Sequence, residues 1–414
     1  MKKTLTALTL AAALGGMIYP VCAAPKHKKT AKTAQAAPPA AETASDPAVS
    51  SAPAAPLPEP EIAATAYAVK DLQSGQVILG QDLDKQIEPA SLTKLMTAYL
   101  TFKALEEGRL KPDQMLTVSA KAWKTEGSRM FLENGKTVSV SDLIKGVIVQ
   151  SANDASVTLA EAIGGSEEQF ARMMNEEAKR LGMTNTNFQN STGLTAPKHL
   201  TTVNDLLTLS GAIIRDYPQY YPIYSIRSFT YNNITQANRN LLLYRDPNVD
   251  GLKTGHTNSA GYNLIASSKR DGRRVLSVVV GASSPEARAT ESSKLLNYAL
   301  QSFETAKMYQ AGQEITKVKV YKGAVGEVPI GFDADTYVTV PYGKTKTLEN
   351  RLETRQPVIA PIAKGQEMGT VKLMDGDKVV AEKKLVALQA VSEAGFFGRL
   401  WDSIVLWFKS LFAD

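Results

Sequence analysis

The chain has 414 residues, of which 43% are apolar, so it is long enough to bury a large core and to form more than one domain. This composition excludes an intrinsically disordered protein. The formal net charge of +6 does not indicate a nucleic-acid partner, because part of the excess lies in the N-terminal segment and no recognition motif accompanies it. We relate the basic character to anionic lipid headgroups or acidic polymers instead.

Residues 1–23 have the three zones of a secretory signal: a basic start, the apolar stretch 5–18 and small residues up to Ala23. The apolar stretch is shorter than the roughly 20 residues that a spanning helix needs, which disfavours an uncleaved anchor. We expect cleavage after Ala23. Cleavage there removes the only cysteine, Cys22, so the mature chain has no disulfide, no cysteine nucleophile and no cysteine-based metal site.

Residues 24–60 are rich in proline and alanine without periodic apolar positions, which predicts a semi-extended linker. The apolar segments 64–70 and 76–80 flank a turn and predict a hairpin. Helical periodicity then dominates, and two strands joined by a tight turn precede a last helix. The predicted helices are 91–106, 140–148, 154–163, 167–181, 202–215 and 286–307, and the predicted strands are 262–268 and 275–281.

This order of elements predicts an α/β fold with an antiparallel sheet sandwiched by helices. From about 312 to 388 the pattern changes to short β-branched segments, which indicate a small all-β domain. Segment 395–412 places its apolar residues, including Trp401 and Trp407, on one half of a helix. A core helix shows the same pattern, but the terminal position and the tryptophans favour a helix that lies in a membrane interface without spanning it.

The predicted domain organisation follows from these changes of pattern. It comprises a signal peptide 1–23, a linker 24–60, a main α/β domain 61–310, a β-rich domain 311–390 and an amphipathic helix 391–414. The first and last of these predict an exported protein attached peripherally to a membrane surface.

Ser91 and Lys94 form the only serine and lysine pair in the chain with this three-residue spacing, and they open a predicted helix. The spacing places the hydroxyl and the amine on one helix face, one turn apart. A lysine kept neutral by burial and neighbouring cations serves as the base that activates a serine. The pair therefore predicts an enzyme with a serine nucleophile, without a metal or a cofactor.

Two further motifs follow in the sequence: Ser151-Ala152-Asn153, and Lys253-Thr254-Gly255-His256. Each of the two is weak alone, but their order after the Ser91 motif makes the joint match specific. The set SxxK, SxN and KTG is typical of class A β-lactamases and penicillin-binding proteins. Together with segment 188–194, the chain resembles the low-molecular-mass penicillin-binding proteins, the serine D-alanyl-D-alanine carboxypeptidases, over nearly its whole mature length.

The motifs assign roles to individual residues. Ser91 attacks the carbonyl of a terminal D-Ala-D-Ala bond, and Lys94 takes its proton. Ser151 relays a proton to the leaving amine, while Asn153 holds the peptide backbone and Lys94. Lys253 keeps Lys94 neutral by charge repulsion.

Three positions after Lys253 complete the predicted substrate site. Thr254 binds the substrate carboxylate, and Gly255 lets the substrate backbone lie against a strand. The resemblance implies an oxyanion hole formed by the backbone amides of Ser91 and His256. It also implies that Arg288 engages the terminal carboxylate of the substrate, although a lone arginine is as often an ordinary surface charge.

The resemblance further implies the partners: peptidoglycan stem peptides as substrate, β-lactams as covalent inhibitors, and the periplasmic face of a bacterial inner membrane as location. Ala152 departs from the glycine usual in the second motif and is expected to add a methyl group in a tight cleft.

Four alternatives compete with this interpretation. A Ser-His-Asp hydrolase is disfavoured, because no GxSxG elbow surrounds any serine and only His199 and His256 lie outside the linker. A class A-like β-lactamase is disfavoured, because the loop 192–203 contains no acidic residue to activate water. A DD-endopeptidase uses the same acyl-enzyme and stays open. A non-enzymatic scaffold has no need for the full set of five motif side chains.

Overall fold

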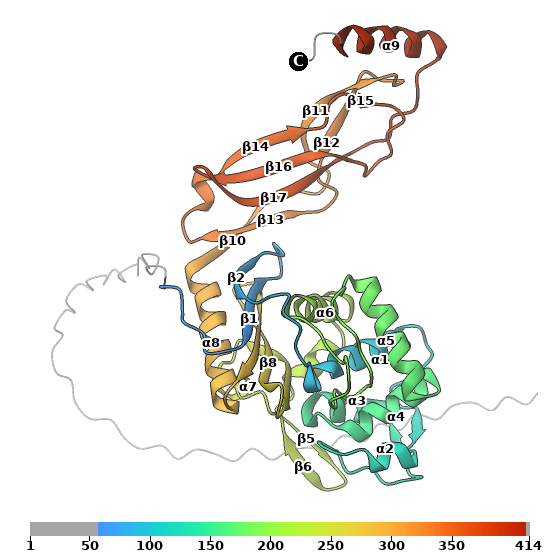
Figure 1. The fold of residues 1–414 in the computed structure, drawn as a ribbon, viewed down its shortest axis with the longest axis vertical. Helices are drawn as coiled ribbons and strands as arrows, with labels where there is room; N and C mark the ends of the chain where they lie inside the picture. Colours follow the sequence, from blue (N-terminus) through green and yellow to red (C-terminus); the bar gives the residue numbers. More distant parts are fainter. Residues whose placement is uncertain (1–56, 411–414) are drawn as a thin grey trace, which may run out of the picture. The chain divides into compact units, whose positions relative to one another are not determined.

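The structure is a computed structural model that describes residues 57–410, so the predicted signal peptide and nearly all of the predicted linker lie outside the described residues. Its main part is built around a five-stranded antiparallel sheet with the strand order β2-β1-β9-β8-β7 (Figure 1). The strands are β1 (Ala66–Asp71), β2 (Val77–Gln81), β7 (Val249–Thr257), β8 (Gly261–Arg270) and β9 (Arg273–Ala282). Distant parts of the chain therefore meet in one sheet, as predicted.

The hairpin of β8 and β9 forms the centre of the sheet because its strands are apolar on both faces and are buried there. Its tight turn places Asp271 and Gly272 at φ values of 49° and 80°. Two consecutive left-handed residues suit the twist of a two-residue hairpin loop, and Asp followed by Gly is a favoured pair for it. The predicted turn is confirmed.

Helices cover both faces of this sheet (Figure 1). Helix α8 packs on one face, against β8 and β9, and the helical block that includes α1 and α6 covers the other. The helices of this part are η1 (Ala90–Thr93), α1 (Lys94–Glu106), α2 (Ala120–Lys124), α3 (Val140–Lys145), η2 (Gly146–Gln150), α4 (Asn153–Gly164), α5 (Glu167–Leu181), α6 (Val203–Asp216), η3 (Tyr221–Ser225), α7 (Leu242–Arg245) and α8 (Pro285–Ser302). Two small hairpins are formed by β3 (Met115–Thr117) with β4 (Thr137–Ser139), and by β5 (Ser228–Tyr231) with β6 (Ile234–Ala237).

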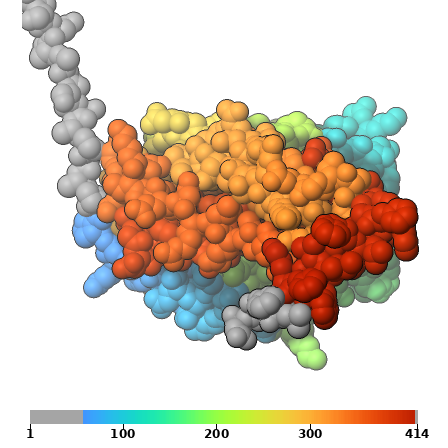
Figure 2. Space-filling model, turned by 90° about the horizontal axis from the view of Figure 1, so that it is seen from above, coloured from blue at the N-terminus to red at the C-terminus, as the bar shows by residue number. Residues whose placement is uncertain are grey.

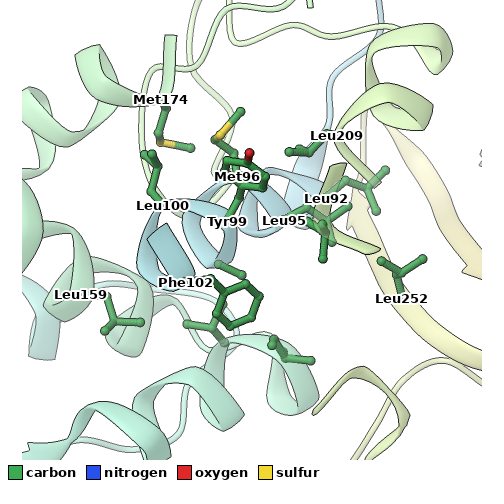
Figure 3. Packing of buried hydrophobic residues seen from close by; sticks show 14 of the residues in the cluster. Leu92, Leu95, Met96, Tyr99, Leu100, Phe102, Leu159, Met174, Leu209 and Leu252 are labelled. Atoms are coloured by element: carbon green, nitrogen blue, oxygen red, sulfur yellow. The ribbon is translucent and has the colours of Figure 1, made fainter. Parts of the chain in front are cut away.

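Helix α1 lies in the middle of the helical block and is buried on all sides. Leu95, Met96, Tyr99 and Phe102 point in different directions from it and all reach packed neighbours (Figure 3). A helix that is apolar all round is expected in the interior of a large domain. The first residue of this helix, Lys94, is consequently held away from water.

The predicted helix 286–307 is too long by five residues. Helix α8 ends at Ser302, and Phe303–Tyr309 forms strand β10, which pairs antiparallel with β13 (Thr336–Pro341). The segment supplies Phe303, Thr305 and Tyr309, residue types that fit a strand with a partner. The partner strand lies some distance along the chain, so the helical pattern alone did not reveal the change.

The β-rich part contains a six-stranded sheet with the order β14-β16-β17-β12-β11-β15, and it has a hydrophobic core of its own. Its strands are β11 (Glu314–Tyr321), β12 (Glu327–Gly331), β14 (Glu349–Thr354), β15 (Val358–Ile359), β16 (Glu367–Asp375) and β17 (Lys378–Ala387), and the short helix η4 (Thr345–Thr347) precedes β14. Such a separate core is what makes a segment a unit of its own.

The C-terminal helix α9 (Phe396–Ser410) lies at the surface, in red in Figure 2. Its polar side contacts the β-rich part, where Lys409 Nζ donates to Tyr321 Oη at 2.9 Å and the Asp402 carboxylate accepts from the Lys322 amide. Leu406 lines a groove beside Tyr321. Among residues 57–410 no helix is long and apolar enough to cross a bilayer.

Candidate active site

Ser91 and Lys94 lie where the short helix η1 passes into α1. The predicted one-turn spacing brings Lys94 Nζ to 3.1 Å from Ser91 Oγ. The residue before the serine, Ala90, has a φ of 48°, a left-handed conformation that costs a residue with a side chain about 1 kcal/mol or more. The surrounding structure therefore imposes this backbone conformation, and with it the orientation of Ser91.

Lys94 is 1% exposed and has three polar neighbours. Besides Ser91 Oγ, its Nζ lies 2.6 Å from Asn153 Oδ1 and 2.5 Å from the Thr192 carbonyl oxygen. A neutral amine has two N–H groups and one lone pair. It satisfies both acceptors as a donor and offers its lone pair to the serine hydroxyl, which is the arrangement a general base requires.

Burial lowers the pKa of the Lys94 ammonium to about 7, with the Arg239 guanidinium adding to the effect and the Asp154 carboxylate opposing it. Burial is thus the first cause of the low basicity of Lys94 and Arg239 adds to it, while the expected repulsion between Lys94 and Lys253 acts on both lysines. The pKa of Lys253 is held well below its usual range by burial and then by Lys94.

Ser151 lines the cleft and is hydrogen-bonded to Lys253. It follows η2 with φ 60° and ψ 37°, and this left-handed turn separates η2 from α4. Lys253 Nζ donates to Ser151 Oγ at 2.8 Å and to the Thr254 carbonyl oxygen at 3.0 Å. Asn153, the first residue of α4, points its amide at Lys94, so both predicted polar residues of the second motif meet the two lysines.

Gly255 lines the cleft and also lies close to the turn that carries Ser91. A Cβ atom at this position would lie 3.0 Å from the Pro89 carbonyl oxygen and 3.2 Å from Leu92 Cγ. The missing side chain therefore lets β7 approach the turn that carries Ser91, while the predicted contact of Gly255 with a substrate backbone stays a prediction. Gly193 is constrained more strongly, because a Cβ there would lie 1.8 Å from the Ala90 carbonyl oxygen and its φ is +84°.

Ala152 also departs from the expectation. It has an ordinary extended conformation with φ −69°, and its methyl group is buried within the hydrophobic core of the helical block. Among the described residues it does not line the cleft. The glycine usual at this position is consequently dispensable here for the backbone and for the shape of the cleft.

His256, Tyr262 and Arg288 form a stack at one wall of the site. The His256 and Tyr262 rings are cross-strand partners in β7 and β8 with centroids 4.0 Å apart, and the Arg288 guanidinium lies 5.6 Å from the Tyr262 centroid. Arg288 is buried, and its Nη1 donates to the Gly255 carbonyl oxygen at 3.2 Å. Its N–H groups thus support the active-site strand from behind, and burial lowers its pKa to about 10.

These side chains surround a cleft of about 410 Å³. Its lining residues are Ser91, Ser128, Ser151, Arg239, Leu241, Thr254, Gly255, His256, Tyr262, Pro285 and Arg288, and none of them is acidic. The positive charge of Arg239 and Arg288 suits a ligand that carries a carboxylate.

Five of the lining residues were not singled out from the sequence: Ser128, Arg239, Leu241, Tyr262 and Pro285. Arg239 Nη1 donates to Ser128 Oγ at 2.7 Å, so the two hold each other at the mouth of the cleft. Tyr262 stacks as described above. None of the five belongs to a motif, and the sequence gave a signal only for Tyr262, which lies in a predicted strand.

His199 lies too deep to act as the base of Ser91. Its Nε2 is 2.8 Å from Thr93 Oγ1, while its Nδ1 accepts from the Gln189 amide at 3.2 Å. Burial lowers its pKa to about 4, so it is neutral and bonded on both sides near pH 7. This geometry leaves no place for a Ser-His-Asp triad.

The geometry is that of an enzyme whose serine nucleophile is served by a lysine. Residues 51–284 match the D-alanyl-D-alanine carboxypeptidase family, and residues 303–393 match the C-terminal domain of penicillin-binding protein 5. The chain belongs to the D-alanyl-D-alanine carboxypeptidase family, which confirms the resemblance seen in the motifs.

Individual relatives agree with this assignment. The chain is 42% identical over 360 residues to the D-alanyl-D-alanine carboxypeptidase DacA of Haemophilus influenzae, covering 86% of this chain and 92% of that protein. It is 41% identical over 366 residues to DacC of Escherichia coli, with coverage of 86% and 92%.

Solved structures confirm the predicted fold class. The crystal structure of penicillin-binding protein 5 from Haemophilus influenzae superimposes with a TM-score of 0.77 at 40% identity, covering 81% of this chain and 100% of that chain. Penicillin-binding protein D2 from Listeria monocytogenes, solved in a cefotaxime-bound form, covers 58% of this chain and 99% of its own with a TM-score of 0.55 at 33% identity.

Proposed function

We propose that this carboxypeptidase removes the terminal D-alanine from peptidoglycan pentapeptide stems through an acyl-enzyme on Ser91. Ser91 Oγ attacks the carbonyl carbon of the D-Ala-D-Ala bond, and its proton passes to the neutral amine of Lys94. The peptide C–N bond then breaks, and the leaving amine takes a proton relayed by Ser151. Water hydrolyses the ester, so one D-alanine and a stem shortened by one residue are released.

A single observation carries this proposal: the fully buried Lys94 Nζ lies 3.1 Å from Ser91 Oγ and has a pKa of about 7. An ordinary lysine remains charged near neutral pH and has no lone pair for a serine proton. The depressed pKa makes the amine a base at the pH at which a cell-wall enzyme works.

We assign the remaining motif residues to charge stabilisation and substrate binding. Strand β7 lies at the edge of the sheet, so alternate backbone groups of this strand have no strand partner and face outward. The amides of His256 and Ser91 supply the oxyanion hole in this proposal. Thr254 binds the substrate carboxylate, Asn153 holds Lys94 and the peptide backbone, and Lys253 holds Ser151 for the proton relay.

The substrate carboxylate is proposed to bind at the cationic wall of the cleft. Arg288 supplies charge there from a buried position and keeps the carbonyl end of Gly255 in place. Arg239 also lines the cleft next to Arg288, since its own carbonyl oxygen accepts from Arg288 Nη2 at 3.4 Å. We therefore include Arg239 among the proposed carboxylate ligands.

The decisive experiment measures D-alanine released from a synthetic pentapeptide, with the Ser91→Ala variant as control. Release by the unaltered enzyme, and none by the variant, is the expected result. No release from the intact enzyme would favour the scaffold, and cleavage only of cross-linked stem dimers would favour the endopeptidase. Mass spectrometry after penicillin addition should show one adduct on the peptide with Ser91, whereas rapid turnover of the drug would favour the β-lactamase.

We also propose that the segments act as predicted: 1–23 for export, 24–60 as a spacer, 61–310 for catalysis, 311–390 as a β-rich support, and 391–414 as a peripheral attachment to the periplasmic face of the inner membrane. The support is the apolar side of α9, where Phe397 is 83% and Trp401 67% exposed. Exposed aromatics on one side of a terminal helix fit a lipid interface. In a flotation experiment the full chain should float with anionic vesicles, whereas a variant that ends at residue 393 should stay in the dense fraction.

A further inference from the structure

Asp154 is a buried carboxylate that the three motifs do not include. It follows Asn153 at the start of α4 and is 1% exposed. Its Oδ1 accepts from the amides of Met130 at 3.1 Å and Ala155 at 2.9 Å, and its Oδ2 accepts from the Leu132 amide at 3.0 Å. A carboxylate that accepts from several backbone amides holds in place the segment to which those amides belong.

That segment, residues 126–132, is also bonded to the catalytic asparagine. Asn153 Nδ2 donates to the Glu126 carbonyl oxygen at 2.5 Å, and the Asn153 amide donates to the Ser128 carbonyl oxygen at 2.7 Å. Phe131, between the two residues bonded to Asp154, has a left-handed φ of 62°. This conformation is unfavourable for a bulky residue, so the bonds on either side of it must hold the segment in place.

A chain of contacts thus runs from Asp154 to the proposed base. The carboxylate fixes segment 126–132, the Glu126 carbonyl oxygen of this segment orients the side chain of Asn153, and Asn153 Oδ1 accepts from Lys94 Nζ at 2.6 Å. An amide that rotated by half a turn would present N–H groups to Lys94 and could no longer accept from it.

Asp154 also contributes charge. Of the charged groups that act on Lys94, Arg239 before α7 disfavours the ammonium and Asp154 on α4 favours it. Lys253 on β7 and the neutral His199 on the loop before α6 also face this group, and Lys94 in turn disfavours their charged forms. Asp154 is therefore the carboxylate that limits how far burial depresses the basicity of Lys94.

We propose that Asp154 is a positioning residue of the carboxypeptidase reaction, which orients Asn153 through segment 126–132 and supplies the negative charge that balances the cations around Lys94. The inference rests on the proposed function of Ser91 and Lys94. It adds a residue that touches neither substrate nor nucleophile.

The test measures the rate at which a fluorescent penicillin acylates Ser91 between pH 5 and pH 9. Asp154→Asn should lower the plateau rate by about tenfold, because the side chain of Asn153 is no longer held in the orientation in which Oδ1 accepts from Lys94. It should also move the acid limb of the profile to lower pH by about half a unit or more, because the charge that favours the Lys94 ammonium is gone.

Two controls separate position from charge. Gly127→Ala disturbs the same segment without removing a charge, since a Cβ there would lie 2.7 Å from Asn153 Nδ2, and it should lower the rate without moving the limb. Asp205→Asn removes another buried carboxylate, which accepts from the Asn185 amide at 3.0 Å, and should lower stability without moving the limb.

An Asp154→Asn profile that keeps both the rate and the limb of the unaltered enzyme would overturn the proposal while leaving the proposed function intact. Absence of any Ser91 adduct in the unaltered enzyme would instead refute the function. If the variant does not fold, hydrogen exchange of the unaltered enzyme decides: the Met130 and Leu132 amides should exchange as slowly as those of buried helices, and rapid exchange would overturn the proposal.

Discussion

Helices α1 and α9 are both rich in apolar residues, and they use them in opposite ways. α1 is buried on every side from Lys94 to Phe102, so that Lys94 at its start is isolated from water. α9 places most of its apolar residues on one side and leaves Phe397, Trp401 and Trp407 exposed. The distribution of apolar residues around a helix, and not their number, therefore separates the two. The first helix keeps a lysine away from water, and the second exposes apolar side chains that another surface can cover.

The largest effect is expected where α1 meets the chemistry. Lys94→Ala should lower the rate of Ser91 acylation by about a thousandfold, because among residues 57–410 Lys94 is the base that is hydrogen-bonded to the hydroxyl. Lys103→Ala, on the same helix but paired with Glu177, should keep the rate of the unaltered enzyme and serves as the matched control. Stopped-flow acylation with penicillin measures both, and a Lys94 variant within tenfold of the unaltered enzyme would contradict the assignment.

The same truncation should have unequal effects on stability in the two helices. Leu95 in α1 is 0% exposed, whereas Leu400 in α9 is 49% exposed. Leu95→Ala should lower the free energy of unfolding by about 3 kcal/mol, through lost burial and a cavity. Leu400→Ala should change it by less than about 0.5 kcal/mol. Urea unfolding followed by circular dichroism gives both values, and equal losses would show that α9 is a core helix after all.

The pH dependence of acylation tests whether α1 really isolates its lysine. Below a pH of about 7 the Lys94 amine is protonated and cannot accept the serine proton. The rate should therefore fall about tenfold for each pH unit below that point and level off above it. Rates measured from pH 5 to pH 9 with a neutral substrate check this, and an acid limb near the ordinary lysine pKa would show that burial does not tune the base.

The smallest effect is expected at the surface of α9. Replacing Trp401 and Trp407 together by alanine should weaken partition onto anionic vesicles by about tenfold or more, because two large apolar side chains no longer enter the interface. Thermal unfolding should be unchanged, since neither ring packs in a core. Sedimentation with vesicles measures the partition, with Val379→Ala, an exposed residue of the β-rich part, as a control that should bind as before.

The sequence predicted the site more completely than it predicted the fold. Ser91, Lys94, Ser151, Asn153 and Lys253 meet because the motifs carry the chemistry, and their residue types are dictated by it. The end of α8 was missed because β10 forms a strand by pairing with β13, and the residues of β10 alone do not indicate that pairing.

Residues whose role depends on what they contact in space were also missed. Arg239 and Ser128 belong to no motif, and they matter because they meet across the cleft. Gly255 was singled out because it lacks a side chain, but the sequence did not reveal that the turn before Leu92 also requires a small residue there. Ala152 was expected in the cleft, yet its methyl group lies in the core, since the left-handed turn at Ser151 redirects the chain.

The three partners of Lys94 Nζ come from η1, from α4 and from the loop that contains Thr192, so they assemble only when segments about a hundred residues apart have come together. An unfolded chain keeps its lysines fully hydrated and protonated, and its serines are then no more reactive than those of a free peptide. Acylation by a β-lactam consequently reports completed folding of this protein: a newly made or misfolded copy is chemically inert toward the drug and escapes inactivation until its core has closed.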